Sequence, residues 1–177
     1  MKKIFKQIDL QDQKIIFAVT SWRIGPLVLL FKIFTESARG YAWSIYAIIL
    51  NVLILSYTEI FFKQTQILWA LFCPLLAWFF GKIIKKCVRR KRPYQIIANF
   101  KALTHSPIDD SFPSLHAAST SAFFSGLFIL HHPYASFVGC WALLVIFSRL
   151  YLGVHYLSDL IAGSILGLLC GMLVWVF

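Results

Sequence analysis

The sequence lacks the cysteine spacing that marks a disulfide framework or a zinc site. Its four cysteines stand at positions 73, 87, 140 and 170, and no two of them form a Cys-x-x-Cys pair. Internal repeats and low-complexity tracts are absent as well. The polar, mixed-charge stretch 1–13 does not have the composition of a cleavable signal peptide. These absences argue against a disulfide-stapled fold, a zinc site and a repeat architecture.

Acidic residues are scarce: seven Asp and Glu stand against seventeen Lys and Arg, which gives a formal net charge of +10. Such an excess predicts an anionic partner. Hydrophobic side chains make up 59% of the 177 residues, above the roughly 45–50% of a soluble domain. Because the chain is so apolar, we expect lipid head groups as the partner rather than nucleic acid.

Long apolar segments indicate the fold class. A helix needs about 20 residues to cross a bilayer, and five segments come close to that length: 41–58, 65–84, 114–131, 134–153 and 156–177. We therefore expect an all-α, polytopic integral membrane helical bundle that forms a single domain over 1–177. Residues 41–177 would be its core, with 85–112 as the only long polar loop.

The first forty residues are less apolar and leave two alternatives. An amphipathic N-terminal helix of the interfacial kind would set apolar residues against Lys2, Lys3 and Lys6. The apolar residues of that face are Ile4, Phe5, Ile8, Ile15 and Ile16. A further span over 15–34 is the other alternative, with Arg23 as its chief obstacle. The expected number of transmembrane helices is therefore five or six.

A histidine, an aspartate and an arginine interrupt the apolar C-terminal region. His155 and Asp159 are four residues apart, so on a helix they would share one face. The carboxylate can then fix the tautomer of the imidazole and leave its other nitrogen free to attack. Arg149 has a planar, permanently charged guanidinium suited to a phosphate. Since charged groups at membrane depth are usually functional, this stretch predicts a nucleophilic histidine that faces a phosphate.

A tight turn over 131–133 lies midway between His116 and Arg149. If the two flanking segments are helices, each of these residues lies roughly 25 Å from the turn, at ~1.5 Å per residue. An antiparallel hairpin would therefore return Arg149 to the membrane face where His116 begins. The polar stretch 85–112 joins that same face directly, so the polar chemistry converges on one side.

Two further motifs lie on that face. The stretch 85–93 holds six basic residues. In the stretch 113–116, Pro113 suits the first turn of a helix, and Ser114 with the free N–H groups beside it can bind an anion at the positive end of the helix dipole. His116 can act as a general acid.

These three stretches resemble the type 2 phosphatidic acid phosphatase superfamily, which also includes vanadate-dependent haloperoxidases. The family pattern is Lys-x6-Arg-Pro, then Pro-Ser-Gly-His, then Ser-Arg-x5-His-x3-Asp. The chain matches the first motif over 85–93 and the third over 148–159. The second reads Pro-Ser-Leu-His over 113–116, with Leu115 where glycine is usual. Leucine keeps its backbone N–H, but it would strain or reshape the site if φ had to be positive.

The resemblance implies a role for each matched residue. His155 would attack phosphorus and form a phosphohistidine, and Asp159 would orient it. His116 would protonate the leaving oxygen and then activate water. Without a metal or any other cofactor, the phosphoryl oxygens would be held by Lys85, Arg92, Ser114, the backbone N–H of Leu115, and Arg149.

The predicted function is therefore hydrolysis of a lipid phosphate monoester or diphosphate by a metal-independent membrane phosphatase. The best substrate prediction is undecaprenyl diphosphate, which would give undecaprenyl phosphate. Phosphatidylglycerophosphate, phosphatidic acid and lipid A are alternative substrates. A lipid phosphotransferase and a non-catalytic protein that binds anionic lipids are alternative functions.

The expected location is the bacterial inner membrane, with six crossings and an active site that faces outward. Five crossings would instead put sixteen of the seventeen Lys and Arg residues on the side of the active site. The positive-inside rule would then place that side in the cytoplasm.

Simpler roles are expected for the remaining polar and small residues. Juxtamembrane charge that attracts lipid head groups explains Lys86, Arg89, Arg90 and Lys91. A solvated loop, rather than a metal site, explains His105, Asp109 and Asp110. Close packing within the bundle or a homodimer contact are the two alternatives for the small-residue stripe Gly163, Gly167 and Gly171.

Overall fold

The computed structural model describes residues 2–39, 46, 61–105 and 108–173. These ranges contain helices and no strand: α1 (Lys2–Thr20), α2 (Gly25–Ser37), α4 (Phe61–Val88), α5 (Pro93–Ile96), α6 (Leu115–Ile129), α7 (Ala135–Tyr151) and α8 (Leu157–Met172). The predicted all-α class is confirmed for this part of the chain. The predicted segment 41–58 lies outside the described residues except for Tyr46. No helix in the described ranges is both long enough and apolar enough to cross a membrane, so the number of spans stays a prediction.

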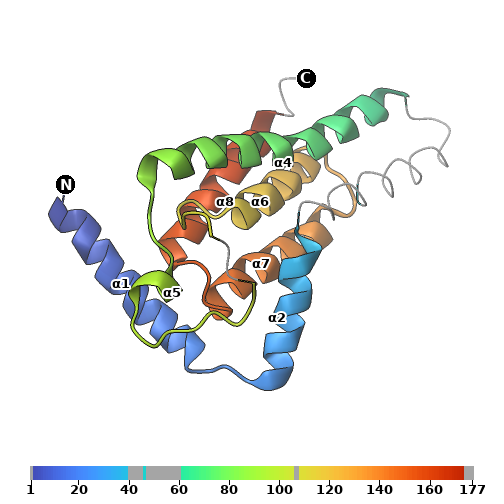
Figure 1. Ribbon diagram of the computed structural model, residues 1–177. Coiled ribbons are helices and arrows are strands. Elements are labelled where there is room, and N and C mark those ends of the chain that lie inside the picture. The colour runs from blue at the N-terminus through green and yellow to red at the C-terminus, as the bar shows by residue number, and fades with distance from the viewer. Residues whose placement is uncertain (1, 40–45, 47–60, 106–107, 174–177) are drawn as a thin grey trace.

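Helix α6 lies at the centre of the bundle, where it packs against α4, α7 and α8 (Figure 1). Ten of its fifteen residues are buried, and most of these ten are Ala, Ser or Gly. Small side chains let neighbouring helices approach closely on several sides at once. Helix α2 packs against α7, and α1 packs against α7 and α8 (Figure 1). The N-terminal helices therefore flank the part of the bundle that carries the second and third motifs.

The predicted hairpin is present. Helix α6 ends at Ile129, α7 begins at Ala135, and His131 in the turn between them has a positive φ of 48°. His116 lies in the first turn of α6 and Arg149 in the last turn of α7. Because the two helices are antiparallel neighbours, both residues lie at the same end of the hairpin, as the sequence predicted.

A single span over 15–34 is not formed. Helix α1 ends at Thr20, and α2 starts at Gly25 with Pro26 in its first turn. Proline has no N–H to continue a preceding helix, so it favours a new helix start. Arg23, in the connection, donates from Nε to the Tyr151 carbonyl and from Nη1 to the Lys101 carbonyl, both at 3.1 Å.

The small-residue stripe of α8 packs within the bundle against α6. A Cβ at Gly163 would overlap the carbonyl oxygen of Ser114, and a Cβ at Gly167 would overlap that of Ala118. The third glycine, Gly171, lies close to the Ser125 side chain in the same way. Intramolecular packing is therefore the use that the structure shows for this stripe.

Gly167→Ala is expected to lower the free energy of unfolding by about 1–3 kcal/mol, because the added methyl group meets backbone atoms rather than a movable side chain. Gly25→Ala is the matched control, since a Cβ there meets nothing within 4 Å. Denaturant unfolding in detergent micelles would compare the two variants. Equal stabilities would contradict the close α6–α8 contact.

Candidate active site

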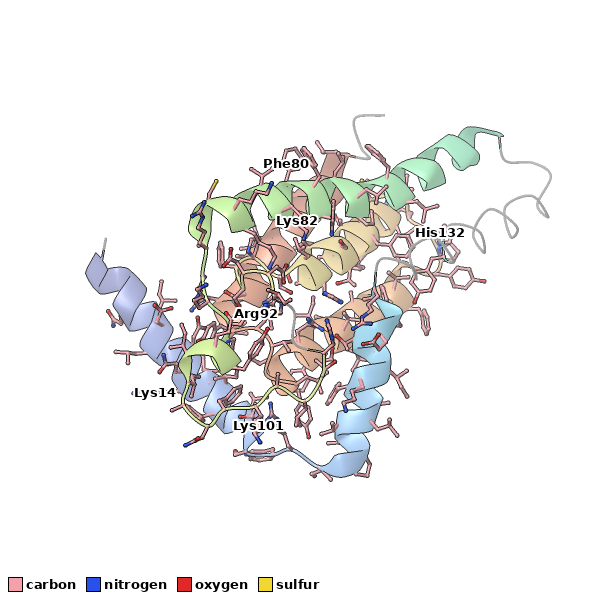
Figure 2. All side chains as sticks on the ribbon, viewed as in Figure 1. Lys14, Phe80, Lys82, Arg92, Lys101 and His132 are labelled. Carbon is pink, nitrogen blue, oxygen red and sulfur yellow. The ribbon has the colours of Figure 1, made fainter. Side chains whose placement is uncertain are left out.

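The ends of the helices α4, α6, α7 and α8 meet where the three motifs converge. Lys85 lies in the last turn of α4, Arg149 in the last turn of α7, and Asp159 in the first turn of α8. The other predicted residues are Arg92 before α5, Ser114 to His116 at the start of α6, and His155 between α7 and α8. Figure 2 shows Arg92 deep between the helices, and His132 far from it at the other end of the hairpin. Lys85, which the sequence placed in a polar loop, is instead helical because α4 continues to Val88.

Most of the predicted residues are removed from solvent. Lys85, Arg92, Ser114, Arg149, His155 and Asp159 are each no more than 4% exposed. Buried cations at such density are costly unless they are paired or hold a ligand. The partners of each charge therefore indicate what the site can do.

His155 and Asp159 approach each other, but not on one helix as predicted. Helix α7 ends before Gly153, which has a left-handed φ of +80°, and α8 begins only at Leu157. His155 therefore lies in the connection and Asp159 in the first helical turn. Their Nδ1 and Oδ2 atoms are 3.5 Å apart. The predicted pairing is present, although the geometry that produces it is a loop followed by a helix start.

The Asp159 carboxylate is held on both of its oxygens. Oδ2 accepts from the Ser111 hydroxyl at 2.5 Å and from the Tyr156 backbone N–H at 3.0 Å. Oδ1 accepts from Nη1 of Arg90 at 2.7 Å. The carbonyl oxygen of Asp159 also accepts from the backbone N–H of Ser114 at 3.0 Å. This last bond ties the first turn of α8 to the start of α6.

Arg92 fixes the tautomer of His155. Its Nη1 lies 3.0 Å from Nε2 of His155 and donates to the Val154 carbonyl at 2.8 Å. A guanidinium only donates hydrogen bonds, so Nε2 must accept and carry no proton. The ring proton then lies on Nδ1, toward Asp159. Burial, and next the charge of Arg92, hold the pKa of His155 well below its ordinary value. The imidazole is therefore neutral, with a lone pair on Nε2.

Asp109 belongs to the site, and the prediction that it is a solvated loop residue is wrong. Its Oδ1 lies 2.7 Å from Nη2 of Arg92, and its Oδ2 lies 3.4 Å from Nζ of Lys85. Burial alone would raise the pKa of Asp109, but the cationic Lys85 and Arg92 outweigh burial and hold that pKa below its ordinary value. Lys85 also donates to the carbonyl oxygens of Asp110 and Ser111. A carboxylate thus occupies part of the cation cluster.

Arg149 and His116 each have a buried polar atom that no described residue contacts by a hydrogen bond. Nη1 of Arg149 donates to the Thr35 hydroxyl of α2 at 2.5 Å. Within the described part of the chain, Nε of Arg149 and Nε2 of His116 are buried and make no hydrogen bond. Buried polar atoms are normally satisfied. Two such atoms beside a cluster of cations therefore favour a site that a polar, anionic ligand completes.

Leu115 does not strain the backbone. It is the first residue of α6, and it is not among the described residues with positive φ. Its side chain points toward α4, where a Cβ built at Gly81 would lie 2.5 Å from its Cδ2. The first N–H groups of a helix have no acceptor within that helix. Leucine in place of glycine therefore keeps the backbone donor and directs its bulk toward Gly81.

Four residues of the site were missed from the sequence. They are Arg90, Asp109, Ser111 and Thr35, whose polar contacts are given above. Arg90 was assigned to lipid anchoring, and its contact with Asp159 shows that this was wrong. The hydroxyl residues stand alone in the sequence without any spacing signal. Only the position of Arg90 within the first motif, and of Asp109 between the first and second motifs, could have drawn attention to them.

Comparisons with known proteins agree with this arrangement. A family model described as the PAP2 superfamily matches residues 66–177. The bacitracin transport permease protein BcrC of Bacillus licheniformis is 28% identical over 136 residues, covering 75% of this chain and 66% of that protein. An undecaprenyl-diphosphatase of Sulfolobus acidocaldarius is 33% identical over 94 residues, covering 52% of this chain and 46% of that protein. The chain thus spans between about half and two thirds of these relatives.

The fold also matches a solved structure. The crystal structure of a transmembrane PAP2 type phosphatidylglycerolphosphate phosphatase from Bacillus subtilis superposes with a TM-score of 0.79 at 24% sequence identity. The match covers 97% of this chain and 86% of that one. At this identity the likeness concerns the fold.

Proposed function

The chain belongs to the PAP2 superfamily, and from this premise we propose that it is a membrane-embedded lipid phosphatase that works through a phosphohistidine. One observation carries the proposal most strongly. His155 directs a lone pair on Nε2 toward Arg92 while its Nδ1 faces Asp159. That arrangement gives a neutral nucleophile, an orienting carboxylate and a phosphate-binding cation in direct contact. The whole chain, 1–177, is proposed to act as one domain.

In the first step, the Arg92 N–H that engages the Nε2 lone pair of His155 turns to a phosphoryl oxygen, and Nε2 then attacks phosphorus and forms a P–N bond. The bond from phosphorus to the leaving oxygen breaks, and His116 gives that oxygen a proton. Asp159 stabilises the positive charge that develops on the imidazole, because its Oδ2 faces Nδ1. His116 suits this role because its Nε2 is buried and has no partner among the described residues.

In the second step, His116 takes a proton from a water molecule, and the water oxygen attacks phosphorus. The P–N bond breaks, so the electron pair returns to Nε2 of His155 and inorganic phosphate leaves. Phosphoryl transfer depends mainly on positioning and on neutralising charge on the equatorial oxygens. Lys85, Arg92 and Arg149 supply three cations for this, and no metal is proposed.

The backbone at the start of α6 would complete the phosphate site. The Ser114 hydroxyl and the Leu115 N–H lie at the positive end of the helix dipole.

Asp109 pairs with Arg92 and Lys85, so an incoming phosphate would compete with a carboxylate for the same cations. This exchange keeps the cations compensated when no substrate is bound.

Undecaprenyl diphosphate is the proposed substrate, with undecaprenyl phosphate and inorganic phosphate as products. The relative from Sulfolobus acidocaldarius that is named an undecaprenyl-diphosphatase supports this choice. Phosphatidylglycerophosphate is the second candidate, supported by a Bacillus subtilis relative named phosphatidylglycerophosphatase B that is 33% identical over 105 residues. Phosphatidic acid and lipid A remain as alternative substrates. The site would face outward from a bacterial inner membrane.

A phosphate-release panel with purified protein in detergent tests the function. It contains undecaprenyl diphosphate, phosphatidylglycerophosphate, phosphatidic acid and lipid A, each with and without EDTA. We expect release from undecaprenyl diphosphate without any added acceptor, and no loss in EDTA. A requirement for a second lipid as acceptor would instead show a phosphotransferase. No release from any lipid would leave only the non-catalytic, lipid-binding alternative.

Two substitutions at Leu115 separate its N–H from its side chain. Leu115→Gly keeps the N–H and is expected to change kcat by less than about threefold, because the donor remains at the start of the helix. Leu115→Pro removes the N–H as well, and its ring fits there, since proline is favoured at a first helical position and Ser114 has the extended backbone (ψ 116°) that precedes proline well.

Loss of one oxyanion donor costs about 10²–10³ in kcat, so Leu115→Pro should lose at least tenfold relative to Leu115→Gly. Initial rates of phosphate release would compare the two variants, and unfolding measurements would confirm that both are folded. Equal rates would exclude the Leu115 N–H from phosphate binding.

A further inference from the structure

Arg90 bridges three carboxylates at the edge of the proposed site. Its Nη1 donates to Oδ1 of Asp159 at 2.7 Å and to the Ser158 hydroxyl at 2.6 Å. Its Nη2 donates to Oδ2 of Asp12 at 2.7 Å and to Oδ1 of Asp9 at 2.6 Å. The guanidinium also lies over the Tyr156 ring, with Cζ 4.3 Å from the ring centroid. Its side chain is only 15% exposed.

Asp12 connects this cation to the N-terminal helix. It lies on α1, is 4% exposed, and is far from Asp159 in sequence. Its Oδ1 accepts from the backbone N–H of Ser158 at 3.1 Å, and its Oδ2 accepts from the Ser158 hydroxyl. Asp12 therefore caps the first turn of α8 from another helix, in the turn that carries Asp159.

The two sides of the Asp159 carboxylate have different tasks. Oδ2 faces His155 and accepts from the Ser111 hydroxyl, whereas Oδ1 accepts from the charged guanidinium of Arg90. A carboxylate anchored on both oxygens cannot rotate away from the imidazole. In metal sites, outer partners of this kind fix the orientation of the ligating histidine, and their removal typically costs about 10–100-fold. We expect a loss of similar size for a nucleophilic histidine held in the same way.

Arg90 is not free to hold substrate. Its two terminal nitrogens carry four N–H groups, and four acceptors already engage them. This separates Arg90 from Arg92, which contacts the His155 ring directly. Loss of Arg90 should therefore act on the rate of the chemical step rather than on substrate binding.

We infer that Arg90 and Asp12 are positioning residues that orient the His155 nucleophile through Asp159. Helix α1, which carries Asp12, therefore contributes a residue to the active site. This inference rests on the proposed function. It extends the site beyond 66–177, the region that matches the family. The helix that the sequence assigned only to the membrane interface thus also supports the catalytic aspartate.

Arg90→Gln, Arg90→Lys and Asp12→Asn test the inference, with Lys91→Gln as the matched control. Lys91 is the next residue, is exposed, and loses the same charge. We expect kcat to fall about 10–100-fold in Arg90→Gln while KM changes less than twofold. Arg90→Lys should recover part of this loss. Asp12→Asn should lower kcat about three- to tenfold. The kcat of the double variant Arg90→Gln/Asp12→Asn should equal that of Arg90→Gln alone, because both residues act in one network.

A second measurement does not need turnover. The ¹H and ¹⁵N chemical shifts of the His155 Nδ1–H group report its hydrogen bond to Asp159. Arg92 keeps the proton on Nδ1 in both proteins, so Arg90→Gln should weaken this bond and move the Nδ1 proton upfield of its wild-type position. Lys91→Gln should leave these shifts unchanged. If Arg90→Gln does not fold, Arg90→Lys and Asp12→Asn give the same comparison.

The outcomes are separable. Phosphate release by Arg90→Gln equal to that of Lys91→Gln would overturn the positioning role, as would a loss confined to KM. Unchanged Nδ1–H chemical shifts of His155 in folded Arg90→Gln would overturn it as well. A wild type that releases no phosphate from any lipid would instead contradict the proposed function, while the chemical shifts would still decide whether Arg90 orients His155.

Discussion

Replacing His155 with alanine is expected to reduce phosphate release at least about 10⁴-fold, because a covalent route loses its attacking atom. No other described imidazole nitrogen combines a neutral lone pair, a carboxylate on the second ring nitrogen and an adjacent guanidinium. The measurement is initial phosphate release from undecaprenyl diphosphate in detergent micelles. His105→Ala is the control, since that histidine lies exposed in the loop before α6.

A trapping experiment makes the same prediction specific to the covalent step. Wild-type protein quenched in base during turnover should carry an acid-labile phosphate, and peptide mapping should place it on His155. His155→Ala should carry none, and His105→Ala should carry as much as the wild type. Residual turnover above about 10% in His155→Ala would contradict a phosphohistidine at this position.

His116→Gln is expected to lower kcat by about 10²–10⁴-fold, the usual contribution of a general acid or base. The size of the loss should depend on the leaving group. The leaving group of an alkyl phosphate is an alkoxide unless its oxygen is protonated. The leaving group of a nitrophenyl phosphate is a nitrophenolate, which is already a stable anion. The variant should therefore retain much more of its first-step rate on a nitrophenyl phosphate than on a lipid alkyl phosphate. Burst kinetics with the two esters would measure the difference.

The second step supplies an independent check on His116. Water still needs a general base after the leaving group has gone, so phosphohistidine should accumulate in His116→Gln when the substrate is a nitrophenyl ester. Loss of the same size on both esters, without accumulation, would show that His116 serves positioning rather than proton transfer. Ser119→Ala is a suitable control, because its hydroxyl lies in the same helix and donates only to the Pro74 carbonyl.

Much of the site could be predicted because its residues are tied to short-range signals. His155 and Asp159 are separated by a fixed short spacing, and Arg149 precedes His155 by less than two helical turns. The hairpin argument correctly brought His116 and Arg149 to one end, since the lengths of two helices and a tight turn determine their relative position. The helical repeat of the glycines on α8 likewise predicted close packing, with the bundle interior and a homodimer contact as alternatives, and the structure shows α6 as the partner.

The rest depends on contacts that no local pattern encodes. Arg90 and Asp12 are 78 residues apart in sequence, and their contact arises only when α1 packs on α8. Arg92 and Asp109 meet because the loop between α5 and α6 folds back over the cations. The break between α1 and α2 is hard to predict from the sequence, because apolar residues on both sides of Arg23 look like one continuous span. Gly25 and Pro26 cause the break, since α2 starts there.

The bond from the Ser114 N–H to the Asp159 carbonyl has a consequence for how such a protein can evolve. The bond joins two main-chain groups. The Ser114 carbonyl also packs against α8, at Gly163, where a Cβ would leave it no room. The spacing between the two catalytic halves is thus inherited from the backbone and is insensitive to most side-chain changes. Exposed positions such as Phe79 and Ile165 take no part in this contact. Substitutions at such positions can therefore accumulate without changing the distance between the starts of α6 and α8.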